Sequence, residues 1–486
     1  MSDPIGADRA VAVGHVVLAT TDTNAFQSLR RTPTSRAERF KIGRALRKQV
    51  PRSSLARWDP QPGRPDPIRL ILASHHGRVE HLIPIRVGRM ISSPYGFLRG
   101  SAIVMAEDVA RLPSTGITPV VCGDSHLGNF GFYASPERDL VMDLNDFDEA
   151  HPGGWEWDLR RLVASIWVAG RHNGFAERHL EDSARNAVRS YRETVAQLAT
   201  EPLLSRSFER LDVDRLHRTT TNPMLREEIM RASSRARNRT SDRVLPKLTA
   251  AVDGRRRIIE SPPLVARVTD REYDAIAEGL DAYLHTIGGH WGRVLGGYTI
   301  EDIVHRVVGV GSVGLRAYVV LLVGSSPDDV VFLQLKQARR SVLAKFVHGE
   351  NALHAHQGQR VVEYQQALQT VSDPLLGWAT VDGLQYYVRQ YRNMKGTVPL
   401  DTLDPSGLSD YANVVGHLLA KGHARTSGAS MIAGYAGTSD RLDVALATFA
   451  RRYADQTEAD HAVMVDAVKH GLLPCEMPSG GGGFRP

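Results

Sequence analysis

The spacing of apolar residues predicts a largely helical chain with strands gathered in two regions. Residues 177–200 and 271–287 carry apolar positions at helical intervals. Shorter helices are predicted over 37–50, 101–111, 155–168, 341–347 and 359–371, and helices dominate the end of the chain to about residue 469.

Apolar runs of strand length predict the remaining elements. A short strand over 118–122 precedes a hairpin over 131–146, which turns at 135–138. Three further strands are predicted over 303–308, 315–323 and 330–335, and Asp382-Gly383 indicates another hairpin turn. The chain therefore belongs to the α+β class.

Composition sets limits on the class of protein. The 486 residues are 42% hydrophobic and 23% charged, as in ordinary globular proteins, and this length suggests two lobes or two to three domains. The longest apolar run, 317–323, is far too short to span a bilayer. We find no signal peptide, so we expect a cytoplasmic protein without a membrane partner. Two distant cysteines, Cys122 and Cys475, exclude a disulfide framework.

The net charge of +6 and the pI of about 9.3 can favour anionic partners. Much of this charge lies in arginine groups at 235–243 and 255–257. These groups fit a solvated helix face and an exposed turn better than a ligand patch. Because no zinc finger or aromatic-basic RNA motif accompanies them, nucleic acid is not an expected partner.

The strand at 118–122 leads into a polar loop that holds Asp124 and, five positions later, Asn129. Protein kinases use this interval in their catalytic loop, where the Asp accepts the proton of the attacking hydroxyl and the Asn ligates magnesium. A polar turn whose side chains bind backbone amides would look the same. His126, inside the loop, is assigned a supporting role.

The hairpin ends in an acidic segment with four carboxylates between Asp143 and Glu149. Burying charged carboxylates next to an apolar strand costs free energy unless they are exposed or bound to cations. Magnesium is a suitable cation, because it prefers carboxylate and phosphate oxygens together. Asp146-Phe147 resembles the metal-binding Asp-Phe of kinases, with Asp148 where a glycine usually stands. Asp148 is therefore a candidate second magnesium ligand. The alternative is an acidic, solvated loop.

A glycine-rich segment at 308–314 contains Gly309, Gly311, Ser312 and Gly314 in a G-x-G-x-x-G pattern. Because a strand rather than a helix follows, a dinucleotide-binding fingerprint is disfavoured. Strand, glycine loop and strand is the kinase arrangement, in which the backbone approaches the phosphates. The alternative is a tight hairpin with glycines at positive φ.

Lys336 ends a predicted strand in an apolar setting, where it needs a partner or a phosphate. Kinases place such a lysine against the α/β-phosphates and a helix glutamate, for which Glu363 is the candidate. An exposed helix carboxylate would look the same. The strand that ends at Gln390 is interpreted as the entry to an adenine-binding hinge, although a core strand would look similar.

These motifs resemble a bacterial family known only as domain of unknown function number twenty-two fifty-two. The resemblance extends from about Arg39 to Asp466 and includes 97–101, 157–159, 360–363 and 419–425. The family has no assigned reaction and implies little biochemistry. In aminoglycoside-phosphotransferase-like enzymes, a pair similar to Asp158-Leu159 follows the metal Asp and supports the catalytic loop. This resemblance gives Asp158 a supporting role, and helix capping is its alternative.

The kinase-like motifs stand in a rotated order, because the glycine loop and lysine follow the catalytic loop by about 160 residues. A circular permutation would produce this order. We expect a two-lobed, protein-kinase-like fold in permuted order, with a helical insertion. Its predicted parts are a flexible N-terminus (1–34), the catalytic-loop and metal-binding part of the larger lobe (35–172), a mostly helical linker (173–300), the nucleotide-binding smaller lobe (301–395), a helical part completing the larger lobe (396–478) and a flexible tail (479–486).

The predicted function is the transfer of a phosphoryl group from ATP, with magnesium, to an unknown hydroxyl acceptor, a small molecule rather than a protein. The alternatives are a nucleotide-binding regulatory protein without turnover and nucleotidyl transfer on the same scaffold. Gly123-Asp124-Ser125 also suggests a serine hydrolase, but Glu458 stands where the Asp-x-x-His pattern of such enzymes needs an aspartate before His461. A metallophosphatase lacks a second His-rich block.

Overall fold

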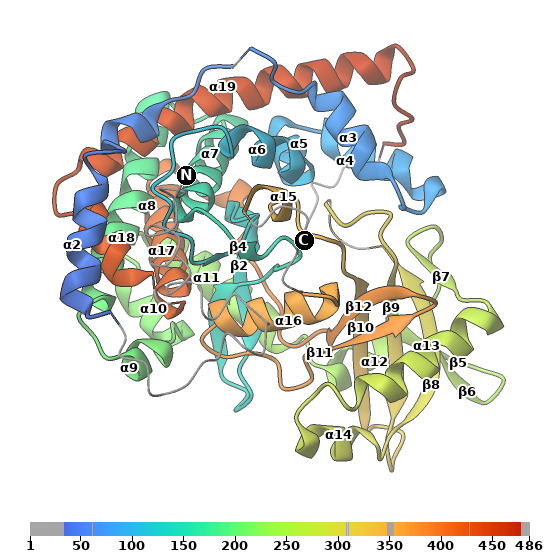
Figure 1. Ribbon diagram of the computed structural model, residues 1–486. Coiled ribbons are helices and arrows are strands. Elements are labelled where there is room, and N and C mark those ends of the chain that lie inside the picture. Colours follow the sequence, from blue (N-terminus) through green and yellow to red (C-terminus); the bar gives the residue numbers. More distant parts are fainter. Residues whose placement is uncertain are drawn as a thin grey trace, which may run out of the picture.

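The computed structural model describes residues 34–60, 62–307, 309, 311–347, 354–426 and 428–477. The predicted flexible ends, 1–34 and 479–486, lie outside these ranges except for residue 34. The described chain is a mixed α+β protein, and Figure 1 shows most helices on one side and a sheet on the other. None of the described helices has the length and apolar composition that a membrane crossing requires.

The helical part is built around α8 (Glu177–Leu198) and α17 (Pro405–Arg425), which pack along each other. Gly416 of α17 permits this approach, since a side chain there would meet the carbonyl oxygen of Ala187 at 2.2 Å. The surrounding helices are α2 (Arg36–Leu46), α7 (Trp155–His172), α9 (Leu203–Ser207), α10 (Val213–Thr219), α11 (Pro223–Arg237), α18 (Ala429–Ala436) and α19 (Arg441–Lys469).

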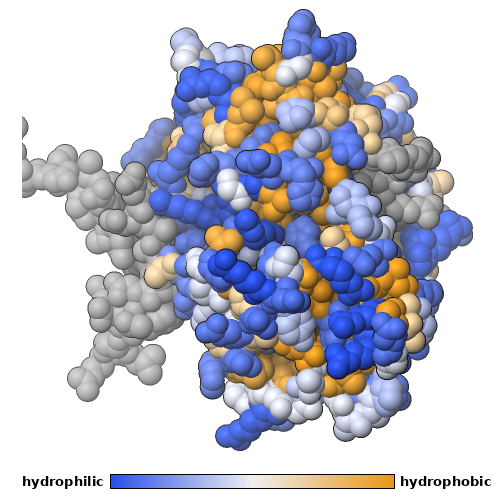
Figure 2. All heavy atoms as spheres, turned by 90° about the vertical axis from the view of Figure 1, so that its right-hand side faces the viewer, coloured by the Kyte–Doolittle hydropathy of each residue, from blue (hydrophilic) through white to orange (hydrophobic). Residues whose placement is uncertain are grey.

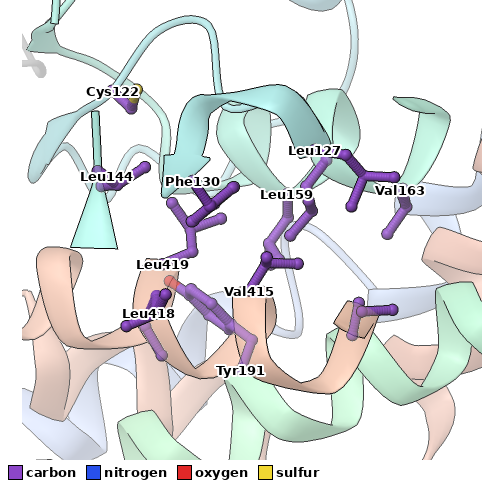
Figure 3. Close-up of a cluster of buried hydrophobic side chains, with 14 of the residues drawn as sticks. Cys122, Leu127, Phe130, Leu144, Leu159, Val163, Tyr191, Val415, Leu418 and Leu419 are labelled. Atoms are coloured by element: carbon purple, nitrogen blue, oxygen red, sulfur yellow. The ribbon is translucent and has the colours of Figure 1, made fainter. Parts of the chain in front are cut away.

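The core of this part supports two short antiparallel pairs of strands. β1 (Val120–Val121) pairs with β4 (His151–Pro152), and β2 (Phe130–Ala134) pairs with β3 (Leu140–Leu144). Figure 3 shows apolar side chains of this core, contributed by the loop after β1, by the start of β2, by α7, by α8 and by α17: Leu127, Phe130, Leu159, Val163, Tyr191, Val415, Leu418 and Leu419.

The second part is a six-stranded antiparallel sheet in the order β11-β12-β10-β9-β8-β7. Its strands are β7 (Val265–Arg267), β8 (Thr299–Arg306), β9 (Ala317–Val323), β10 (Val330–Gln337), β11 (Gly377–Val381) and β12 (Leu384–Gln390). α15 (Ala344–Val347) and α16 (Gln357–Leu368) lie between β10 and β11 in the chain. Asp382 and Gly383, both at positive φ, form the predicted turn between β11 and β12.

The sheet buries both faces, because successive side chains of a strand point to opposite sides. Val320 packs in a cluster with α13 (Asp270–Tyr283) and α14 (Gly289–Leu295), whereas Leu321 packs in a cluster with α12 (Ser241–Leu248). β5 (Thr249–Val252) and β6 (Arg255–Ile258) form a hairpin, and Ile258 joins the second cluster. The region 173–300 is therefore divided, with α8 to α11 in the helical part and α12 to α14 on the sheet.

A run of short helices between 67 and 109 is absent from the predicted elements except for its last member. These helices are α3 (Pro67–His75), α4 (Ile83–Ile91), α5 (Pro94–Gly100) and α6 (Ala102–Val109). They are too short to produce a long periodic pattern, and the first three carry proline in their first turn. Figure 1 places α3 and α4 above the sheet at the end of α19. On that side of the molecule, Figure 2 shows a mainly hydrophilic band between more hydrophobic areas.

A buried ion pair joins the β2–β3 hairpin to α17. The Lys421 ammonium donates to Asp143 at 2.6 Å, and the two side chains are 1% and 2% exposed. Asp143 also accepts hydrogen bonds from the backbone amides of Leu144 and Thr370. Neither charge has access to water, so each depends on the other.

We predict that Lys421→Met destabilises the protein by about 3–5 kcal/mol, because it leaves the Asp143 charge buried without its cation. Urea denaturation would measure the change. The double variant Lys421→Met/Asp143→Asn, which removes both charges, should recover part of this loss. An unchanged unfolding midpoint in the single variant would contradict the role of the pair.

Candidate functional site

The loop after β1 is held by a single buried carboxylate. Asp158, in the first turn of α7, accepts hydrogen bonds from the backbone amides of Cys122 at 2.7 Å and Gly123 at 2.9 Å. The Ser125 hydroxyl donates to the Asp158 carbonyl. Gly123 has a φ of 78°, and a side chain there would meet the carbonyl oxygen of Glu149 at 2.3 Å. The loop therefore has one conformation, tight against the acidic segment.

Asp158 is itself positioned from the opposite side. The ring of His423 in α17 lies with Nε2 3.1 Å from Asp158, and the Tyr191 hydroxyl of α8 lies 2.7 Å from its Nδ1. All three side chains are buried. Three helices thus fix the carboxylate that holds the predicted catalytic loop.

Asp124 projects from this loop into a cleft and is oriented by Arg161. The Arg161 guanidinium donates from Nε to Oδ1 of Asp124 at 2.8 Å, and its Nη2 donates to the Leu98 carbonyl. The other carboxylate oxygen, Oδ2, lies 3.9 Å from Nε2 of His126. Burial raises the pKa of Asp124, while Arg161 opposes this rise. Arg161 therefore occupies one oxygen and leaves the second toward the cleft.

His126 and Asn129 complete the loop. Nδ1 of His126 accepts the Gly128 amide at 3.1 Å, so the ring proton resides on Nε2, the nitrogen nearest Asp124. Burial and the charges of Arg99 and Arg161 lower the pKa of His126, which keeps the ring neutral. The Asn129 amide donates to the Asp124 carbonyl at 2.5 Å. Both predicted residues therefore surround Asp124.

The acidic segment and the sheet meet at Lys336. Its ammonium, 3% exposed at the end of β10, donates to Oδ2 of Asp148 at 2.7 Å and lies 3.6 Å from Asp146. The Ser312 hydroxyl of the glycine loop donates to the same Asp148 oxygen at 3.2 Å. Residues from three predicted motifs thus converge on one carboxylate.

The charges at this junction hold each other ionised. Burial opposes the charge of Lys336, but Asp146 and Asp148 raise its pKa above the ordinary value. Burial also opposes the charge of Asp148, but Lys336 outweighs it and lowers the pKa of Asp148 to about 2. Neighbouring Glu149, whose Oε2 accepts the Val342 amide, has its pKa raised to about 7 by burial.

The predicted pairing of Lys336 with Glu363 requires correction. Glu363 instead interacts with His354 at 2.9 Å and accepts from Gln359 at 2.8 Å. The place beside the lysine is taken by Asp148, the residue that replaces the usual glycine. α16 reaches the acidic segment through Arg360, one turn before Glu363, which donates to the Asp148 carbonyl at 2.8 Å.

The glycine loop lies under the helices that precede α7. Val79 donates its amide to the Gly314 carbonyl at 2.8 Å, and Arg78 donates to the Val313 carbonyl. Gly314 has a φ of 84°, and a side chain there would lie 3.1 Å from Cβ of Arg78. Arg89 donates to the Gly309 carbonyl. The segment 67–100 therefore holds the loop from outside.

A cleft of about 510 Å³ lies between the acidic segment, the glycine loop and these helices. The predicted site residues in its lining are Asp124, His126, Asn129, Asp146, Asp148, Gly309, Gly311 and Ser312. Lys336 reaches the site through its contact with Asp148. Gly314, Asp158, Glu363 and Gln390 lie outside the lining.

Gln390 lies at the end of β12, where its backbone amide donates to Asp373 at 2.6 Å. Its predicted contact with a nucleotide base stays a prediction. The adjacent Arg389 is near the acidic segment: burial alone would lower its pKa, but Tyr387, Asp146 and Asp148 raise it.

The acidic segment fits a magnesium ion bound together with phosphate oxygens. Among the described residues, no group of three His, Cys, Asp or Glu side chains forms a complete metal site. Magnesium, however, binds through one or two carboxylates with substrate phosphates. Oδ1 of Asp148 is buried without a hydrogen-bond donor, and the Asp146 side chain is 39% exposed. Asp146, Asp148 and Asn129 are the residues that could hold it.

The geometry does not support a serine hydrolase. Ser125 is completely buried, and its hydroxyl is bound to the carbonyl of Asp158. His461 lies on α19, where it contacts the Ile91 carbonyl, and Glu458 lies near Arg171. No nucleophile and base are brought together by these residues.

Comparison with known proteins identifies a family. A family model described as an uncharacterized protein conserved in bacteria, DUF2252, matches residues 78–467. The chain belongs to the DUF2252 family. This match confirms the resemblance drawn from the motifs. No curated protein and no solved structure matches the chain.

The DUF2252 match contains every cleft residue from Arg78 onward, including residues that the motifs did not suggest as functional. Arg161 lies one helical turn after Asp158, so its place on the same face of α7 was a signal that could have identified it. Arg78 and Arg86 of the segment 67–100 gave no such signal, because their part of the segment was not predicted, whereas Arg99 stands in the family motif 97–101.

One histidine near the cleft makes stability depend on pH. Nη1 of Arg86 lies 2.9 Å from Nε2 of His75, and burial together with Arg86 and Arg78 lowers the pKa of His75 from 6.5 to about 4. Between pH 6.5 and 4 the unfolded state therefore binds more protons than the folded state. Folding stability is lost as pH falls through this window.

We predict that His75→Gln, whose amide oxygen can still accept from Arg86, reduces the loss of stability between pH 6.5 and pH 4. The expected difference from the wild type is on the order of 1–3 kcal/mol at pH 4. Urea denaturation at both pH values would measure it. Equal losses in the two proteins would show that His75 does not remain neutral in the folded state.

Proposed function

We propose that this protein is an ATP- and magnesium-dependent phosphotransferase that acts on a hydroxyl-bearing acceptor. The observation that carries the proposal is the contact of Lys336 with Asp148, at 2.7 Å across 188 positions of the chain. It brings the predicted lysine and glycine loop to the predicted metal acids. The same cleft contains Asp124, the predicted base.

The proposed chemistry assigns one task to each group. Lys336 and the backbone of the glycine loop would bind the phosphates of ATP, and Asp124 would accept the proton of the acceptor hydroxyl as its oxygen bonds to the γ-phosphorus and ADP leaves. Magnesium on Asp146, Asp148 and Asn129 would neutralise phosphate charge. Such a site works by positioning and electrostatic stabilisation.

We further propose that the fold is a protein-kinase-like fold in circularly permuted order. Strand, glycine loop, strand, lysine strand, helix and hairpin follow each other from β8 to β12. Thr426, which ends α17, accepts a hydrogen bond at 3.3 Å from the amide of Val120, which begins β1, across 306 positions. A short link there would run from α17 directly into the catalytic loop, as in an unpermuted chain. Cytoplasmic location remains an expectation.

We predict that ATP with magnesium raises the thermal stability of the wild type, but much less that of Asp146→Ala. Ligand at about a hundred times its dissociation constant should stabilise by roughly 2.7 kcal/mol. Differential scanning fluorimetry would measure both shifts. Glu137→Ala, on the exposed turn at the other end of the hairpin, is the matched control and should keep the full shift. Equal shifts in Asp146→Ala and the wild type would remove Asp146 from the site.

We predict that Asp124→Asn binds ATP with nearly wild-type affinity. Its rate of slow phosphate transfer to water should fall by at least about a hundredfold, since a general base contributes roughly 10²–10⁴ in rate. Release of inorganic phosphate would measure this reaction. Binding without turnover in the wild type, across varied acceptors, would instead favour the nucleotide-binding regulatory alternative.

A further inference from the structure

One wall of the cleft is lined with arginines. Arg78 and Arg86 come from the segment 67–100, and Arg339 comes from the chain that follows β10. The three side chains lie close together. Burial lowers the pKa of Arg78, and the positive charges of Arg86 and Arg339 lower it further. Arg86 is 1% exposed, and burial with Arg339 lowers its pKa to about 10.

These three arginines bind neutral groups. Arg78 donates to the carbonyls of Ser74 and Val313, and Arg339 donates to the same Ser74 carbonyl. Arg86 donates to the Gly100 carbonyl and contacts the neutral ring of His75. Within the described part of the chain, none of the three forms an ion pair with a carboxylate.

The nearby acids do not compensate this charge fully. Asp124 is paired with Arg161, and Asp148 is paired with Lys336. Glu149 and Asp148 do favour the charge of Arg78, but burial and the two neighbouring arginines outweigh them. Like charges that lie close together and are partly buried are costly unless an anion joins them.

The arginines share one cleft with the predicted base, Asp124, and Arg78 also contacts the glycine loop. The arginines face the glycine loop at Gly309, Gly311 and Ser312, within the cleft that contains Asp124. Gln390, the predicted contact of the base, lies outside the lining of that cleft. An acceptor whose hydroxyl approaches Asp124 would therefore lie in the same cleft as these arginines, and the test below separates its oxyanion from the phosphates of the nucleotide.

We propose that Arg78 and Arg339, supported by Arg86, form a site for an oxyanion carried by the acceptor. The acceptor would be a small alcohol with its own phosphate or a similar multiply charged oxyanion, since guanidinium groups match the geometry of phosphate oxygens. This inference rests on the proposed function. It adds the substrate class and gives the segment 67–100 a role in recognition.

The test measures the binding of inorganic phosphate by calorimetry to protein saturated with magnesium and a non-hydrolysable ATP analogue. Phosphate should bind to this complex, and Arg339→Gln should weaken it by about tenfold or more, the effect of one charge-assisted hydrogen bond. Binding of the analogue should change less than about twofold. Arg111→Gln is the matched control, because its guanidinium also donates to a carbonyl but lies outside the cleft.

Four results would overturn the acceptor assignment. If the analogue displaces phosphate competitively, the arginines hold the phosphates of the nucleotide. If phosphate does not bind, or if a folded Arg339→Gln variant with a wild-type urea midpoint binds it equally well, the wall is not an oxyanion site. The analogue could also fail to bind while phosphate binds in a way that depends on Arg339. The proposed function and the acceptor assignment would then both fail, although the oxyanion site would stand.

Discussion

The arrangement of the cleft depends on one buried ion pair, that of Lys336 with Asp148. A lysine that is 3% exposed has to find a negative partner, because its charge is otherwise too costly to bury. Asp148 meets this need from the other part of the molecule, with Ser312 and the backbone contact of Arg360 beside it. The sheet, the glycine loop, α16 and the acidic segment are thereby tied to a single point.

The loop that carries Asp124 is fixed by a second, independent set of contacts. These contacts are a series of hydrogen bonds between three helices, from Tyr191 to His423 and from His423 to Asp158. Asp158 then accepts the backbone amides of Cys122 and Gly123. The apolar core of Figure 3 lies directly beneath. A rigid loop of this kind suits a group that has to be aimed rather than one that moves, and electrostatic catalysis depends on such positioning.

The segment 67–100 links these two sets and changes the charge of the cleft. It covers the glycine loop through Val79 and Arg78, and it supplies the Leu98 carbonyl that helps to orient Arg161. Asp124 and Asp148 have cationic partners within the protein, whereas Arg78 and Arg86 of this segment bind carbonyls.

The sequence by itself determined the local features: the strand before the Asp124 loop, the hairpin that ends in Asp146 and Asp148, the glycine loop and the lysine strand. Each is specified by a short run of residues and its immediate neighbours. The family was also evident from these motifs and is confirmed by the match over 78–467. The tertiary structure alone decided which charges meet. Glu363 was an equally reasonable partner for Lys336 along the chain, but the fold places Asp148 there and turns Arg360 toward the site. The cluster of arginines along the cleft could not be predicted for the same reason, since the burial and proximity of distant arginines are properties of the packed chain and not of spacing.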